Sequence, residues 1–331
     1  MMKILVATDH LDNEHIQRLR KAFPTVEFTQ AVDQAAILKE ASSADVILGG
    51  MNPEVFAVAK NLKWVQSSGA GVERFQFPAF INSKVILTNA SGIHNSVSEH
   101  ALGLILAFGR RLSMYIRFQS EHKWDRREFE PWHGLFIDEL MGKVLGIIGL
   151  GHIGHEIARK GKCFGMTVIA TKRSPVSKPA YVDELLPPKG LGDLLRRSDF
   201  VVICVPITTE THHLIGEKEL RMMKKNAILI NIGRGDVIEK DSLIKALKER
   251  WIAGAGLDVF ETEPLPSESE LWDFENVIIT PHVAGSTPHY SERLYDLFVE
   301  NLKRFNERRP LINVIDKKIG AGAGPYSSDA R

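Results

Sequence analysis

The sequence is poor in cysteine, with Cys163 and Cys204 as the only two among 331 residues. Cys163 falls in a predicted helix and Cys204 in an apolar run, so we expect two buried thiols. So few cysteines exclude a disulfide-rich scaffold and a cysteine-based metal site, and we predict that the protein holds no metal.

An excess of charge of one sign and long hydrophobic runs are also missing. Lysine and arginine number 42 against 41 for aspartate and glutamate, which leaves no basic surplus for nucleic acid or an anionic membrane. The apolar start at residues 1–7 turns polar at Thr8, too soon for a signal peptide, and no stretch approaches the length of a membrane span. We therefore expect a cytoplasmic protein that binds neither nucleic acid nor membranes.

What the sequence does have is an alternation of short apolar runs with helical patterns. The candidate strands of a first α/β unit lie at residues 4–7, 26–29, 46–48, 64–66 and 85–88. Those of a second unit lie at residues 144–148, 167–171, 200–205, 227–231, 253–257 and 277–280. Strands joined by helical crossovers predict doubly wound parallel sheets, so the expected fold class is α/β with two domains.

The predicted domains are interleaved in the chain. A long helix is expected from Ser96, and another at about residues 287–307 is long enough to return to the first unit. We therefore place a discontinuous first domain at residues 1–98 plus 284–316 and a second domain at 99–283. The glycine-containing residues 317–331 are expected to form a flexible tail.

A glycine-rich turn stands between a predicted strand and a predicted helix. Gly149, Gly151 and Gly154 follow the apolar run 143–148 and precede a helix-compatible stretch from His155 to Phe164. In this context the turn exposes the first peptide N–H groups of the helix, and these groups, together with the helix dipole, form a pyrophosphate site. The pattern therefore predicts a dinucleotide cofactor, with His152 and Ile153 inside its binding turn.

The residues after the next strand bear on which dinucleotide is bound. An NAD site would place an acidic residue there, about twenty residues past the glycines, to bind the ribose 2′-hydroxyl. This chain instead has Lys172, Arg173 and Ser174, which suit a 2′-phosphate. We therefore predict a preference for NADP(H), with NAD(H) possible; the alternative is that the two cations belong to an ordinary solvated loop.

Three later segments place charged residues just beyond the carboxyl ends of apolar strands, where open α/β sheets bind ligands. They contribute Arg234, Glu263 and His282. A guanidinium can hold a substrate carboxylate and polarise a carbonyl, and a histidine paired with a carboxylate can deliver a proton near neutral pH. Taken singly, each could be structural, since the chain has 12 histidines and many surface ion pairs are expected. Their shared position favours a catalytic set.

With these motifs, the chain resembles the D-isomer-specific 2-hydroxyacid dehydrogenases, from Ser68-Gly69-Ala70-Gly71-Val72 through the glycine turn to Thr280-Pro281-His282. The resemblance implies two Rossmann-like or flavodoxin-like domains, substrate-binding and dinucleotide-binding, with the active site in the interdomain cleft. It implies that Arg234 anchors a 2-keto acid, His282 is the acid/base and Glu263 its partner. It assigns the substrate carboxylate to the backbone of Ala70 and Gly71. Further cofactor contacts are implied at Ser98, Val205, Pro206, Ile232, Gly233 and Asp258.

The expected activity is the reversible, NAD(P)H-dependent reduction of a small 2-keto acid, such as glyoxylate or hydroxypyruvate, to the D-2-hydroxy acid. Glu73 stands where the family usually has aspartate, and Ile93-His94 replaces a common asparagine-containing pair. Because of these two departures, the resemblance does not fix the shape of the substrate pocket. A phosphoglycerate or formate dehydrogenase is an alternative, although the latter would call for glutamine near position 263. A dinucleotide-sensing corepressor-type module is the alternative from another class.

The stretch from Arg110 to Trp132 lacks a core pattern of its own, so we expect a dimerisation arm near residues 110–140. By resemblance the protein is expected to be a homodimer. Trp124 and Trp132 in this arm either pack in the dimer interface or reach toward the partner's active site.

Overall fold

The computed structural model describes residues 1–124, 139–174 and 176–322, and these form two compact units. The described residues of 1–93 and 287–322 make up unit 1, and those of 94–286 make up unit 2. The division falls after residues 93 and 286, whereas the sequence placed it after 98 and 283. The first difference arises because helix α5 (Asn95–Gly109) is continuous, so its first turn belongs with the rest of the helix.

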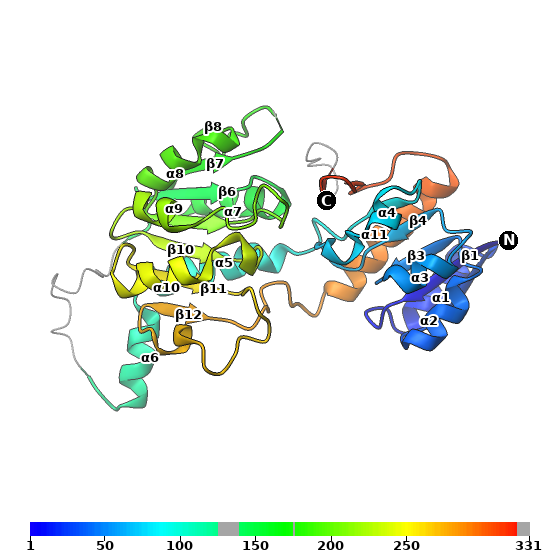
Figure 1. The fold of residues 1–331 in the computed structure, drawn as a ribbon, viewed down its shortest axis with the longest axis horizontal. Coiled ribbons are helices and arrows are strands. Elements are labelled where there is room, and N and C mark those ends of the chain that lie inside the picture. The colour runs from blue at the N-terminus through cyan, green and yellow to red at the C-terminus, as the bar shows by residue number, and fades with distance from the viewer. Residues whose placement is uncertain (125–138, 175, 323–331) are drawn as a thin grey trace. The chain divides into compact units, whose positions relative to one another are not determined.

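Unit 2 contains a seven-stranded sheet in the order β12-β11-β10-β9-β6-β7-β8, and every strand pair in it is parallel (Figure 1). Its strands are β6 (Val144–Ile148), β7 (Thr167–Thr171), β8 (Glu184–Leu186), β9 (Phe200–Ile203), β10 (Ile228–Asn231), β11 (Gly254–Leu257) and β12 (Val277–Ile279). Six of these strands were predicted. The prediction missed β8, a three-residue, half-buried strand that pairs with β7 at the edge of the sheet in the described part of the chain. Its sequence is too short to stand out as an apolar run.

Both faces of this sheet are covered by helices. Side chains alternate along each strand, so Leu145 and Ile147 point into one apolar cluster and Ile148 into the other. Helices α5 and α7 (His152–Cys163) pack into the first cluster. Helices α8 (Leu191–Arg197), α9 (Glu217–Met222) and α10 (Lys240–Lys248) pack into the second. The carboxyl edge of the sheet is thereby left as the place where side chains can meet a ligand.

Unit 1 is built on a five-stranded parallel sheet in the order β2-β1-β3-β4-β5. Its strands are β1 (Met2–Ala7), β2 (Val26–Gln30), β3 (Val46–Gly49), β4 (Trp64–Gln66) and β5 (Ile86–Thr88). Helices α1 (Asn13–Ala22) and α11 (Tyr290–Asn306) cover one face, and α2 (Gln34–Ala41), α3 (Pro53–Val58) and α4 (Pro78–Ile81) cover the other. Trp64 stacks on Phe298 with ring centroids 5.5 Å apart, so the late helix α11 is an integral part of this core.

The end of the described chain also belongs to unit 1. Strand β13 (Ile315–Asp316) pairs with β14 (Ala321–Gly322), and the Lys317 ammonium donates to the carbonyl oxygens of Phe80, Ser83 and Val85 at 2.8–2.9 Å. The expectation of a flexible tail from residue 317 was therefore wrong for residues 317–322. Lys317 binds three backbone carbonyls that lie more than 230 positions away in the sequence, so no local pattern could predict these contacts. Residues 323–331 lie outside the described part of the chain.

The predicted arm begins with helix α6 (Leu112–Ser120), which contains no buried residue. Leu112 and Ile116 are exposed, and Trp124 is 93% exposed. Trp132 lies outside the described residues.

Among the described helices, none is long and apolar enough to cross a membrane. Cys163, predicted to be buried, is exposed at the end of α7 because that end of the helix faces solvent, whereas Cys204 is half-buried.

Candidate active site

The predicted site segments of unit 2 all start from one row of residues across its sheet. Parallel pairing aligns the ends of six neighbouring strands in register, at Thr171, Ile148, Ile203, Asn231, Leu257 and Ile279. The glycine turn, Lys172, Val205, Arg234, Asp258 and His282 all follow within a few residues of this row. The register therefore brings to one edge segments that are more than a hundred residues apart in the chain.

The glycine turn fits a dinucleotide pyrophosphate. Gly149 has a φ of +99°, which disfavours a side chain, and a Cβ on Gly154 would lie 2.4 Å from the Gly149 carbonyl oxygen. Gly151 is the N-cap of α7; a Cβ there would meet nothing within 4 Å, and no side chain caps the helix. The N-terminus of α7 thus has no side-chain cap and lies beside the open space at Gly151, as an anion site requires.

Lys172 lies against this turn. Its ammonium donates to the Leu150 carbonyl oxygen at 2.8 Å, and burial, together with the neighbouring Arg173 charge, lowers its pKa. Arg173 and Ser174 are exposed just beyond it. Lys172 is therefore held at the turn, while Arg173 and Ser174 remain accessible to a ligand.

Two histidines of α7 lie near Lys172. Burial and the Lys172 charge lower the pKa of His152, and the same causes lower that of His155 to about 4. The His155 Nδ1 lies 3.0 Å from the Tyr181 hydroxyl. In both residues the lowered pKa favours the neutral ring.

Ser98, a predicted cofactor residue, lies in the first part of α5. It is completely buried; its hydroxyl donates to the Asn95 carbonyl oxygen at 2.7 Å and accepts from the Lys160 ammonium at 2.7 Å. Its polar atoms are therefore used inside unit 2, and it serves to join α5 to α7.

The histidine and glutamate predicted to act together are in direct contact. The His282 Nδ1 lies 2.7 Å from Glu263 Oε2, and the other carboxylate oxygen of Glu263 accepts from the Phe260 amide at 3.0 Å. A carboxylate can only accept, so Nδ1 carries the proton and the Nε2 of the ring is left for a ligand. The His282 side chain is 50% exposed, which gives it the access that an acid/base needs.

Asp258 holds the histidine segment in place. Its carboxylate is buried and accepts from the Thr280 hydroxyl at 2.6 Å and from the Val283 and Ala284 amides, both at 3.0 Å. Its backbone carbonyl accepts from the His282 amide at 2.8 Å. The predicted cofactor role of Asp258 is thus accompanied by a structural one, because its carboxylate spans the turn that carries His282 at a φ of +52°.

Sequence reasoning gave no role to His100, which supports the same turn. Its Nε2 lies 2.9 Å from the Thr280 hydroxyl and 3.6 Å from Asp258 Oδ1. The contact joins α5 to the end of β12 across 180 positions of sequence. The residues around His100 carry no motif that would have predicted it.

Arg234 is half-buried at the end of β10. The Asn231 side-chain amide donates to its carbonyl oxygen at 2.9 Å, and its own Nη1 donates to the Gly233 carbonyl oxygen at 2.7 Å. A Cβ on the adjacent Gly235 would lie 1.9 Å from the Phe260 carbonyl carbon, so the β10 turn and the loop that leads to Glu263 are in backbone contact. Arg234 and Glu263 are thereby carried by two loops that pack tightly together.

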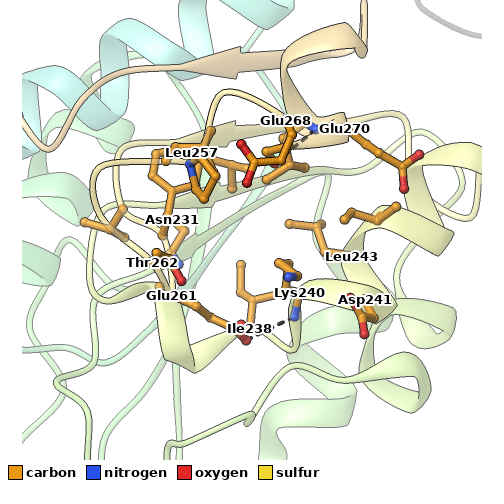
Figure 2. Close-up of a pocket in the computed structure, with 18 residues that line it drawn as sticks. Asn231, Ile238, Lys240, Asp241, Leu243, Leu257, Glu261, Thr262, Glu268 and Glu270 are labelled. Carbon is orange, nitrogen blue, oxygen red and sulfur yellow. Dashed lines mark hydrogen bonds between the residues drawn. The ribbon is translucent and has the colours of Figure 1, made fainter.

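A cavity of about 300 Å³ lies beside this edge, between the ends of β10 and β11 and helix α10 (Figure 2). Figure 2 shows Asn231, Leu257, Glu261 and Thr262 along its walls, with Lys240 and Asp241 from α10. Arg234, Glu263 and His282 are absent from its lining. The cavity is therefore separate from the histidine–glutamate pair.

Comparison with known proteins identifies the family. The family model described as "D-isomer specific 2-hydroxyacid dehydrogenase, NAD binding domain" matches residues 102–284. The chain belongs to the D-isomer-specific 2-hydroxyacid dehydrogenases. It is therefore an oxidoreductase that acts on CH–OH groups, with a nicotinamide dinucleotide as cofactor, as the glycine turn and the histidine–glutamate pair indicate.

Individual relatives match between 80% and 97% of the chain. A glyoxylate reductase from Thermococcus onnurineus is 34% identical over 96% of both proteins, and one from Thermococcus gammatolerans is 40% identical over 80% of both. A solved structure of an NADPH-dependent glyoxylate/hydroxypyruvate reductase from Sinorhizobium meliloti, in complex with NADP and sulfate, is 29% identical and has a TM-score of 0.82. It matches 97% of this dehydrogenase and all of the other chain. The predictions of family, fold class and reaction type are confirmed.

Proposed function

We propose that this dehydrogenase reduces glyoxylate, hydroxypyruvate or a similarly small 2-keto acid to the D-2-hydroxy acid, reversibly and with NADPH as the preferred cofactor. The observation that carries the proposal is the 2.7 Å contact of His282 with Glu263 on the edge that also holds Arg234. The names of the glyoxylate reductases from Thermococcus support the substrate class.

In this proposal Arg234 binds and polarises the keto acid, because a guanidinium can donate two parallel hydrogen bonds to its oxygen atoms. The backbone amides of Ala70 and Gly71 in unit 1 receive the substrate carboxylate. NADPH, when bound, supplies the hydride that reaches C2. His282 delivers a proton from Nε2 to the carbonyl oxygen, while Glu263 holds the ring and balances its positive charge.

The proposed cofactor preference follows from the residues after β7. Residues 172–174 include no carboxylate that could accept from a ribose 2′-hydroxyl or repel a 2′-phosphate. The exposed Arg173 guanidinium and Ser174 hydroxyl, by contrast, can both donate to a phosphate. The NADP bound in the structure of the Sinorhizobium meliloti reductase is consistent with this proposal.

We expect wild-type kcat/KM for glyoxylate and hydroxypyruvate to be higher with NADPH than with NADH, and Arg173→Asp to reverse that order because the carboxylate repels the 2′-phosphate. The measurement is steady-state kinetics with both cofactors, with pyruvate and a bulkier 2-keto acid included to rank substrates. Arg196→Asp on the surface of α8 makes the same charge change elsewhere and should leave the order unchanged. A wild-type preference for NADH would refute the cofactor proposal.

We also propose that the protein is a homodimer assembled through the segment that contains α6. The helix buries none of its residues within the chain and exposes Leu112 and Ile116, apolar side chains that an interface would cover. Sedimentation is therefore expected to give twice the 37.0 kDa chain mass at micromolar concentration. Replacing both Leu112 and Ile116 by glutamate should shift the species toward monomer, and a wild type that sediments as a monomer would contradict the proposal.

A further inference from the structure

The loop Ser68–Gly71, which follows β4 in unit 1, has its carbonyl groups held from the interior of that unit. The Gln66 side-chain amide donates to the carbonyl oxygen of Ser67 at 3.0 Å, and the Tyr290 hydroxyl donates to that of Ser68. The Ala90 amide donates to the carbonyl oxygen of Gly69 at 3.0 Å. The Asn89 side-chain amide donates to that of Ala70 at 2.6 Å. The carbonyl oxygens of the four consecutive residues 67–70 therefore all accept hydrogen bonds from donors of unit 1.

This pattern fixes the direction of the amide groups. In a planar trans peptide the carbonyl oxygen of one residue and the N–H of the next point in opposite directions. When the Gly69 and Ala70 carbonyls turn toward Ala90 and Asn89, the N–H groups of Ala70 and Gly71 must turn away from them. Among the hydrogen bonds of the described residues, neither of these two amides is a donor. Adjacent outward amides form a cradle for an anion.

We propose that Tyr290 and Asn89 are positioning residues, which hold the Ser68–Gly71 loop so that the Ala70 and Gly71 amides receive the carboxylate of the 2-keto acid. The inference rests on the proposed function and extends it to residues that do not touch substrate themselves. Neither side chain was singled out by the sequence.

Tyr290 is itself well fixed. It stands at the first position of α11, where the Arg18 guanidinium donates to Glu292 at 2.8 Å and the Arg293 guanidinium donates to the Ile93 carbonyl at 3.1 Å. His10 packs edge-on against its ring, with centroids 4.7 Å apart. Burial raises the pKa of Tyr290 to about 12, so its hydroxyl remains a donor throughout the neutral range.

Asn89 is fixed from the other side. Its Oδ1 accepts from the Ser91 amide at 3.1 Å, and the Asn313 side chain donates to the carbonyls of Asn89 and Ser91 at 3.3 and 2.5 Å. Two anchors from separate segments, one from α11 and one from the end of β5, therefore hold two peptides of the same loop. Loss of the Asn89 side chain frees the Ala70–Gly71 peptide, which carries the Gly71 amide. Loss of the Tyr290 hydroxyl frees the Ser68–Gly69 peptide, which directly precedes the peptide that carries the Ala70 amide. Either change should shift an amide away from the bound carboxylate.

The test compares Tyr290→Phe and Asn89→Ala with the wild type, using glyoxylate as substrate and oxamate as a non-reducible carboxylate analogue. We expect each variant to raise the KM for glyoxylate and the inhibition constant of oxamate about 10-fold, with kcat and the KM for NADPH within about 2-fold. Tyr295→Phe removes a hydroxyl from the same helix, beneath Arg18 and away from the loop, and should change none of these constants. Melting temperatures identify any variant that loses activity by unfolding.

The positioning role and the proposed function fail in different ways. An active wild type whose glyoxylate KM and oxamate inhibition constant stay unchanged in both variants would overturn the positioning role alone. That role is also overturned if the KM for NADPH rises as much as that for glyoxylate, or if Tyr295→Phe has an equal effect. A folded wild type that reduces none of the 2-keto acids would refute the proposed function and, with it, this inference.

Discussion

Replacing His282 by glutamine is expected to lower kcat for 2-keto acid reduction by about 10²- to 10⁴-fold at every pH, the usual contribution of a positioned proton donor. Glutamine can still reach Glu263, so the loop geometry is retained, but no group remains that can deliver a proton to the carbonyl oxygen. The measurement is kcat against pH together with the Kd for NADPH, which should be unchanged. Turnover near the wild-type level would show that another residue is the acid.

The companion variant Glu263→Gln tests how the proton is held. Reduction needs His282 protonated, and the Glu263 carboxylate 2.7 Å from Nδ1 stabilises the imidazolium. Glu263→Gln keeps a hydrogen-bonding side chain but removes that negative charge, so kcat/KM for glyoxylate reduction should fall at least about 10-fold while the Kd for NADPH is unchanged. Glu261→Gln, two positions away and paired with His213 at 3.1 Å, is the matched control and should leave kcat/KM unchanged. A wild-type kcat/KM in Glu263→Gln would refute the role of the pair.

Replacing Arg234 by alanine is expected to reduce kcat/KM for glyoxylate by about 10³-fold, through both a higher KM and a lower kcat. The guanidinium would bind the keto acid and polarise its carbonyl, so binding and chemistry are lost together. Arg234→Lys retains the charge without the two-pronged donor geometry and should recover only part of the loss.

Cofactor binding provides the control for Arg234. Fluorescence titration should give the same Kd for NADPH in the wild type and in both Arg234 variants, since the glycine turn and Lys172 lie at the ends of β6 and β7, not β10. A fall in NADPH affinity as large as the fall in glyoxylate efficiency would show that Arg234 serves the cofactor, contrary to the role proposed for it.

Much of the fold could be predicted because its strands are apolar on both faces. The central strands β6, β9 and β10 are buried from both sides and stand out as short continuous runs between helical patterns. The edge strand β8 was missed because it is half-buried and only three residues long. The ordered stretch after Asp316 was missed because it depends on carbonyls of residues 80–85 that accept from Lys317.

The sequence by itself determined the family, the two α/β units and the catalytic candidates, since each of these depends on a local motif that follows a strand. Arg234, Glu263 and His282 were predicted separately, and their convergence followed only from the general rule that ligands bind at strand ends. The contact between Glu263 and His282 and the row of aligned strand ends are observed only in the folded chain.

Only the tertiary structure decided which residues hold these groups in place. The Tyr290 hydroxyl reaches the Ser68 carbonyl across 222 positions, and His100 reaches Thr280 across 180. The physical reason is that backbone carbonyls and side-chain hydroxyls occur throughout the chain. The residue type of a donor and the residues next to it in sequence therefore do not identify its acceptor. The packing of helix against sheet selects that acceptor, by setting which polar atoms lie within hydrogen-bonding distance once the apolar faces are buried.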